Sequence, residues 1–216
     1  MFRKIILYSF IGIILIVAGI FIYKQINIRI IDTNASLEML TLSEMEERSD
    51  IIIKGSFIRN KDQVLQYTAE DTDMPMYWET ITELEVTDIF KTDGSIKSGG
   101  TIVVVEPYAI WRTLKGAFML TTEGYLPISK NKEYILFLVD WNGRYQIVGH
   151  TQGKHVIHLS GKILTEELLE IEDMGWYYPQ LHEEVLNKYN KESKEKVEEE
   201  SSEEKDTELD NSYEDE

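Results

Sequence analysis

Residues 133–149 read EYILFLVDWNGRYQIVG, and this stretch decides the fold class. Two runs of alternating apolar residues flank Asn142-Gly143. A two-residue Asn-Gly loop favours the type I′ turn of a β-hairpin, because both of its central residues need a positive φ. In the register that such a turn sets, Leu138 faces Ile147 on the side that we expect to be the core.

Further strands are expected on both sides of this hairpin. The runs that predict them lie at 50–58, 63–69, 76–90, 101–105 and 154–159. Gly55 inside the first run suggests a bulge or a close backbone approach, and residues 59–62 suggest a polar turn. Residues 101–105 are apolar on both faces, which predicts a strand at the centre of the sheet.

Together these strands predict a mainly β fold, and we expect a small OB-like barrel, closed or partly open, with short peripheral helices. Ser43 and Glu46 have capping-box spacing and predict a helix at 44–48. Thr165 is expected to cap a second helix that ends at Gly175. A third helix is expected to start at Pro179, with a stripe that packs on the barrel: Leu181, Val185 and Tyr189.

The candidate binding residues lie in residues 106–132, which we expect to form a long loop. The aromatic residues Tyr108, Trp111 and Tyr125 could form a binding surface with Arg112 as its polar handle. The alternative is that the three rings plug the open end of the barrel. Long ordered loops on a rigid sheet are common sites of function, so the loop is our candidate ligand-binding site.

The N-terminal residues 5–23 carry no charge and no proline. A helix of this length covers roughly the 30 Å hydrocarbon thickness of a bilayer, so the run predicts one transmembrane helix that acts as an uncleaved signal anchor. A cleaved signal peptide is the alternative, but the only candidates for its cleavage site, Ala18 and Gly19, lie inside the apolar run. Arg3 and Lys4 precede the run and Lys24 and Arg29 follow it, so the positive charges on its two sides are nearly balanced. We expect a single-pass protein with its folded part outside the cytoplasm, because Arg3 and Lys4 abut the run; a folded part inside the cytoplasm is the alternative.

Composition excludes several classes of function. The net charge of −17 argues against a nucleic-acid partner, and the absence of cysteine excludes disulfides and thiol catalysis. Residues 191–216 hold thirteen acids and four lysines, which predicts a disordered acidic tail. The expected division is a cytoplasmic head at 1–4, an anchor at 5–23, a stalk at 24–42, a barrel domain at 43–160, helices packed on the barrel at 161–190 and the tail at 191–216.

The strand pattern resembles a known class of surface domain. The residues that carry the resemblance lie at 49–57, 86–91, 101–105 and 132–138. They are similar to membrane-anchored surface domains of Gram-positive bacteria, whose layout is like the OB-like barrels of netrin and metalloproteinase-inhibitor modules. The resemblance implies the fold and a surface setting only. Inhibition of proteases in that family depends on an N-terminal cysteine, which this chain lacks.

Catalytic and metal-binding motifs are weak. Asp71 and its neighbours at 70–73 lack the glycine and closing glutamate of an EF-hand. His155 and His158 would lie on opposite faces of a strand, which disfavours a metal site with His150. No cofactor is expected. The sequence therefore predicts a membrane-tethered, non-enzymatic module with a protein, peptide or cell-wall partner.

The alternative is an enzyme, a hydrolase that acts on envelope material. Its candidate paired carboxylates are those of Glu83 and Glu85, because glycoside hydrolysis needs two carboxyl groups facing one cleft. The two glutamates alternate with Leu84, and a strand with one solvated face shows the same alternation without any catalytic role.

Overall fold

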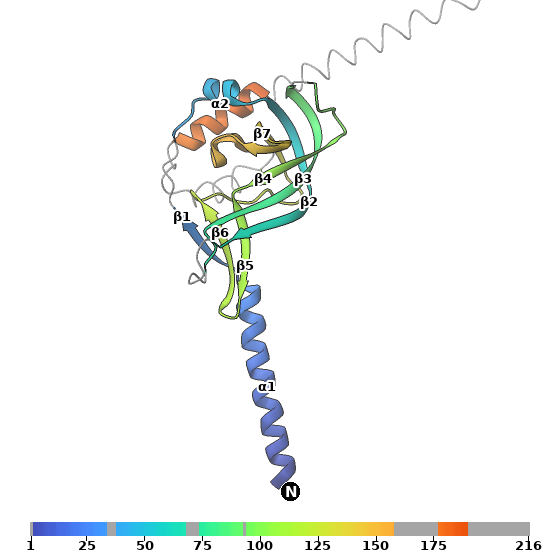
Figure 1. Cartoon of the computed structure of the whole chain (residues 1–216), viewed down its shortest axis with the longest axis vertical. Coiled ribbons are helices and arrows are strands. Elements are labelled where there is room, and N and C mark those ends of the chain that lie inside the picture. The colour runs from blue at the N-terminus through green and yellow to red at the C-terminus, as the bar shows by residue number, and fades with distance from the viewer. Residues whose placement is uncertain (1, 34–37, 68–73, 93, 158–176, 190–216) are drawn as a thin grey trace, which may run out of the picture.

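The computed structural model describes residues 2–33, 38–67, 74–92, 94–157 and 177–189, without the side chains of residues 2–7 and 9. The helix α1 extends as a rod from one end of a β-rich body, and α2 lies at the opposite end (Figure 1). The acidic loop at 70–73, His158, the predicted helix capped by Thr165 and the predicted tail at 191–216 lie outside the described residues.

The elements follow one another in this order: α1 Phe2–Ile26, β1 Arg29–Thr33, α2 Leu42–Arg48, β2 Ile51–Gln66, β3 Tyr77–Lys91, β4 Thr101–Glu106, β5 Tyr108–Thr113, β6 Gly116–Thr122, β7 Glu133–Trp141, β8 Arg144–Ile147, the 3-10 turn η1 His150–Gly153, β9 Lys154–Ile157, and a helix at 177–189. The fold is mainly β, as predicted. In the part of the chain that the structure describes, no helix has the length and hydropathy of a membrane span, so the predicted anchor is not supported by the structure.

The main sheet has the strand order β2-β3-β4-β8-β7-β9, and β7 also pairs with β2. This extra pairing curls the sheet partly into a ring, although it is not a clean barrel. β4 lies between β3 and β8, as its apolar sequence predicted, and pairs with β8 in parallel.

The β7–β8 hairpin confirms the prediction that rested on its turn. Leu138 lies opposite Ile147 in the antiparallel register. Asn142 and Gly143 have φ values of 55° and 79°, the left-handed conformation that a type I′ turn requires. The paired residues lie close together in the sequence, which explains why the sequence alone predicted this hairpin.

The polar turn predicted at 59–62 is wrong, because β2 runs through it as one long strand. Register shifts between Phe57 and Arg59 and between Asn60 and Asp62 absorb the irregular sequence as bulges along the β3 edge. The close approach predicted at Gly55 is present, since a Cβ there would lie 3.0 Å from the carbonyl oxygen of Glu85.

The prediction of a long loop at 106–132 is also wrong. These residues contain the β5–β6 hairpin, which forms a second sheet of order β1-β6-β5. β1, from the predicted stalk, adds to this sheet in parallel, with Arg29 opposite Phe118. The segment after α1 is thus tied to the body by strand hydrogen bonds.

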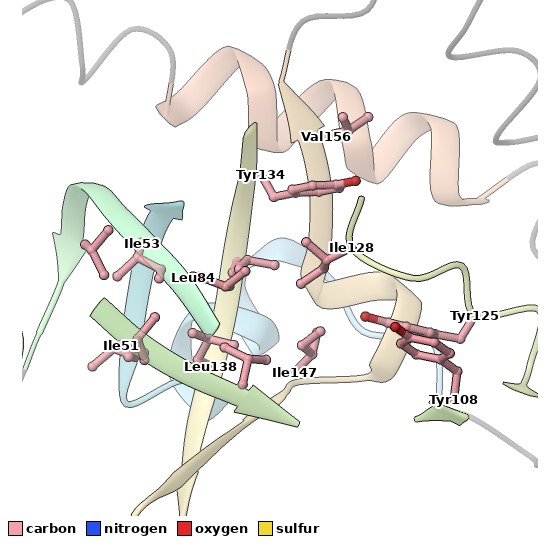
Figure 2. Close-up of a cluster of buried hydrophobic side chains, with 14 residues drawn as sticks. Ile51, Ile53, Leu84, Tyr108, Tyr125, Ile128, Tyr134, Leu138, Ile147 and Val156 are labelled. Atoms are coloured by element: carbon pink, nitrogen blue, oxygen red, sulfur yellow. The ribbon is translucent and has the colours of Figure 1, made fainter. Parts of the chain in front are cut away.

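Two clusters of buried apolar side chains form the core. One lies inside the curled sheet and includes Ile53, Leu84 and Leu138 (Figure 2). The other lies between the sheet and the helices and contains Phe137. The stripe predicted on the last helix is buried in this second cluster: Leu181, Val185 and Tyr189.

The predicted helix at 44–48 is present as α2, but its capping box is shifted by two residues. Thr41 is the N-cap and accepts a hydrogen bond of 3.3 Å from the Glu44 backbone amide, while the Glu44 carboxylate accepts one of 2.8 Å from the Thr41 amide. Both Thr41 and Ser43 have a glutamate three residues later. Glu46 does not cap, because its carboxylate accepts hydrogen bonds from Lys188 and Tyr189 of the last helix.

Candidate functional site

The four residues predicted to bind a ligand are split between two environments. Tyr108 and Tyr125 are in the core, with exposures of 4% and 0%. Trp111 is half-buried and Arg112 is exposed, and both lie farther along β5 toward the end of α1. The structure therefore brings the first two together, and separately the second two.

Tyr108 and Tyr125 fill one edge of the core inside the curled sheet. Their rings are nearly parallel, with centroids 6.4 Å apart, and they lie one over the other in Figure 2. The Tyr108 hydroxyl accepts a hydrogen bond of 2.9 Å from the Asn60 amide. Burial raises the pKa of Tyr108 to about 12 and that of Tyr125 well above its usual value, so both hydroxyls stay protonated.

Beside these rings lies a fully buried carboxyl group, that of Glu106 at the end of β4. It accepts hydrogen bonds from the Tyr125 hydroxyl at 2.8 Å and from the Ile128 backbone amide at 2.7 Å, and a third from the Thr82 hydroxyl. Burial raises the pKa of Glu106, although the charge of Lys154 and these donors act in the opposite direction. A carboxyl group with this many donors is satisfied without contacting solvent.

Lys154 is a buried cation whose charge acts on this carboxyl group. Its ammonium group donates a hydrogen bond to the Leu126 carbonyl oxygen and lies 4.2 Å from the centroid of the Tyr125 ring. Burial lowers the pKa of Lys154 to about 8, and the attraction to Glu106 opposes this shift. The cluster of Glu106, Lys154 and Tyr125 locks β4, β9 and the segment after β6 together. The sequence analysis did not predict this cluster. The only signal in the sequence was an acidic residue, Glu106, at the end of an apolar strand.

Trp111 and Arg112 lie on the small sheet next to α1. The Trp111 ring contacts the Phe118 ring, with centroids 5.3 Å apart, and the Arg29 guanidinium lies 4.4 Å from the Phe118 centroid. Arg112 donates a hydrogen bond of 3.0 Å to the carbonyl oxygen of Gln25 in the last turn of α1. This half of the predicted surface is therefore accessible and lies at the end where α1 meets the body.

A second buried pair, which the sequence reasoning did not predict, is His155 with His182. The two Nδ1 atoms are 3.3 Å apart, and the His155 ring stacks on the Tyr178 ring at a centroid distance of 5.5 Å. The Nε2 atoms of both histidines have no hydrogen-bond partner within the described residues. No group of three or more side chains suited to holding a metal ion occurs in those residues. Burial lowers the pKa of both histidines, so the pair joins β9 to the last helix as neutral rings.

The carboxylates proposed for a hydrolase lie on β3. Glu83 pairs with Arg59 at 2.7 Å and with Lys61 at 3.6 Å, and the hydrogen bond from Arg59 lowers the pKa of Glu83. Glu85 is exposed. An acid that protonates a leaving group needs a raised pKa. The pKa of Glu83 is lowered instead, so Glu83 is poorly suited to that role.

The comparisons with known proteins add no family to this description. No protein-family model matches the sequence, and a search of curated proteins finds no match.

Proposed function

We propose that this protein is a membrane-tethered binding module, held at the outer face of the cell membrane by α1. The observation that carries the proposal is the exposure of consecutive apolar side chains in the middle of α1. Leu15, Ile16 and Val17 are 66%, 63% and 61% exposed, and successive residues point about 100° apart around a helix. A helix that is apolar all round needs an apolar medium to cover it, and a bilayer is one.

The body is proposed to be an OB-like barrel of the kind carried by surface domains of Gram-positive bacteria. The ring order β2-β3-β4-β8-β7, closed by the β2–β7 pairing, supports this assignment. The parallel β4–β8 pair supports it too, because a Greek-key barrel needs a long connection between two of its strands, and β5 and β6 lie in that connection.

The binding surface is proposed to include Trp111 and Arg112, beside the end of α1. An aromatic ring next to a guanidinium is a common composition for the anchor of an interface, because both types of side chain are enriched among the residues that dominate binding. The partner is proposed to be a protein, a peptide or a cell-wall component. The charge of −17 makes a nucleic acid a poor partner.

The tether is tested by fractionation. The full chain should stay in the membrane pellet after an alkaline carbonate wash, whereas a variant starting at residue 24 should be released into the supernatant. Release of the full chain by the same wash would contradict the tether.

The binding surface is tested by chemical cross-linking in cells followed by pull-down of the full chain. The double variant Trp111→Ala with Arg112→Ala should lose partners by about tenfold in yield, the size expected for two interface anchors. Trp141→Ala is the matched control, because Trp141 is 59% exposed on the β7–β8 hairpin. If the double variant keeps its circular dichroism melting curve and recovers the same partners as the wild type, the surface is wrong.

A further inference from the structure

Among the described residues, the turn that joins β5 to β6 carries the most exposed large apolar side chain. Leu114 is 88% exposed there, and Lys115 beside it is also exposed. The turn lies at the end of the body from which α1 extends (Figure 1). A lone exposed leucine is ordinary, but this one has a fixed position relative to the apolar helix.

Two hydrogen bonds hold the turn against the last residues of α1 and the segment that follows, and the backbones approach closely at Gly116. The Gln25 side chain donates a hydrogen bond of 2.7 Å to the Thr113 carbonyl oxygen, and Arg29 donates one of 3.3 Å to that of Lys115. A Cβ at Gly116 would lie 3.2 Å from the Lys24 carbonyl oxygen. The turn is thus level with Lys24, the first residue after the charge-free run that ends at Tyr23.

Positive charge gathers around this turn although the chain as a whole carries a net charge of −17. Four cationic residues from three separate segments meet there: Lys24, Arg29, Arg112 and Lys115. Among the described residues, none of the four has a carboxylate within ion-pair distance. Their charge is therefore available to an outside anion.

We propose that the β5–β6 turn is a contact surface for anionic phospholipid headgroups, with Leu114 entering the apolar side of the interface and the cations contacting phosphates. Binding at a membrane interface strengthens with buried apolar area and with attraction between cations and anionic lipids, and the turn offers both an aliphatic side chain and basic residues at the end of the apolar helix. The inference rests on the proposed function, because the turn meets lipid only if α1 is embedded. It adds that the body is held in one orientation on the bilayer, which would fix the position of Trp111.

The chain has no cysteine, so a single introduced thiol can report on each position. The full chain is reconstituted into vesicles of phosphatidylcholine, with or without phosphatidylglycerol, and carries an environment-sensitive fluorophore at Leu114→Cys. Ile14→Cys reports whether α1 is embedded, and Glu47→Cys on α2 is the control at the far end of the body. We expect a blue shift and protection from an aqueous quencher at position 114 in the anionic vesicles, and none at position 47.

A charge variant separates the headgroup contact from simple proximity. Lys115→Gln in the Leu114→Cys background should reduce the protection at position 114 by about fivefold, the effect expected for the loss of one cation at an anionic surface. The Lys115 side chain has no described partner inside the protein, so the fold should be unaffected.

Four results would overturn the inference. Equal protection at position 114 in neutral and anionic vesicles would remove the headgroup contact. An embedded label at position 14 with an exposed label at position 114 would reject the inference and leave the tether intact, and shielding seen only in native membranes would assign the turn to a protein partner. A label at position 14 that stays in water would reject the proposed function as well.

Discussion

Arg112 on β5 donates a hydrogen bond of 3.0 Å to the carbonyl oxygen of Gln25 in the last turn of α1, although 87 residues separate them in sequence. The Gln25 side chain returns a hydrogen bond of 2.7 Å to the Thr113 carbonyl oxygen. The two bonds join the apolar helix to the body, so that the helix and the small sheet should move together.

Arg112→Ala should therefore loosen the angle between α1 and the body without unfolding either. The bond is exposed, so its loss should cost about 1 kcal/mol or less of unfolding free energy. Spin labels at Ile14→Cys and Glu47→Cys report the angle as a distance distribution, which should broaden in the variant. Arg59→Ala, which removes an exposed arginine paired with Glu83 away from α1, is the matched control and should leave the distribution unchanged. An unbroadened distribution for Arg112→Ala would show that the Arg112 bond does not set the angle and that the Gln25–Thr113 hydrogen bond and the strand pairing of β1 are sufficient.

The Glu106 cluster should dominate the stability of the body. Glu106→Ala leaves the Tyr125 hydroxyl, the Thr82 hydroxyl and the Ile128 amide without their acceptor and leaves Lys154 buried without its countercharge. Removal of one partner from a buried charged network typically costs about 3–5 kcal/mol, and we expect a loss of that size in urea unfolding. Glu85→Ala, on the exposed face of β3, should change stability by less than about 0.5 kcal/mol.

A double variant tests whether charge compensation is the cause. Glu106→Gln with Lys154→Met should be more stable than Glu106→Gln alone, because no buried cation is left without a partner. If the double variant is the less stable of the two, Lys154 contributes through packing on Tyr125, and the charge argument fails.

The histidine pair should make the docking of the last helix sensitive to acid. Burial lowers the pKa of His182 to about 4, and burial together with the charge of His182 holds the pKa of His155 well below its usual value. A histidine whose pKa is lower in the folded state binds its proton more readily when unfolded. Its contribution to stability is therefore full above pH about 6.5 and is lost as the pH falls toward 4.

The free energy of unfolding should fall by about 2 kcal/mol less between pH 7 and pH 5 in His182→Gln than in the wild type. Urea unfolding at each pH measures this difference. The comparison of the variant with the wild type isolates this effect. His150, whose pKa burial lowers, and Glu106, whose pKa burial raises, titrate in both proteins. An identical pH dependence in the two proteins would contradict the assignment of the acid sensitivity to this pair.

The features that sequence predicted well are those decided by neighbouring residues. The Asn142-Gly143 turn sets its own register, and the stripe of Leu181, Val185 and Tyr189 follows from helical spacing. In both cases the residues that interact are close in sequence or share a simple period, so local chemistry was sufficient.

The features that sequence missed depend on distant partners. Residues 59–62 extend as a strand because β3 continues opposite them and bulges absorb the mismatch. The β5–β6 hairpin has the turn residues Leu114 and Lys115, which carry no strong turn preference, and is held by β1 and α1. Glu106 has its donors on Thr82 and Ile128, 24 and 22 residues away, and no local pattern shows that they meet.

The central claim is that α1 lies in the cell membrane and holds the β body outside the cell. The most direct measurement is protease treatment of intact cells that express the full chain with a tag at its C-terminus. The account predicts that the tag is digested on intact cells while a cytoplasmic marker survives, and that the N-terminal fragment stays in the membrane pellet. Protection of the tag until the cells are lysed would contradict it, as would recovery of the body in the medium with a new terminus near residue 24.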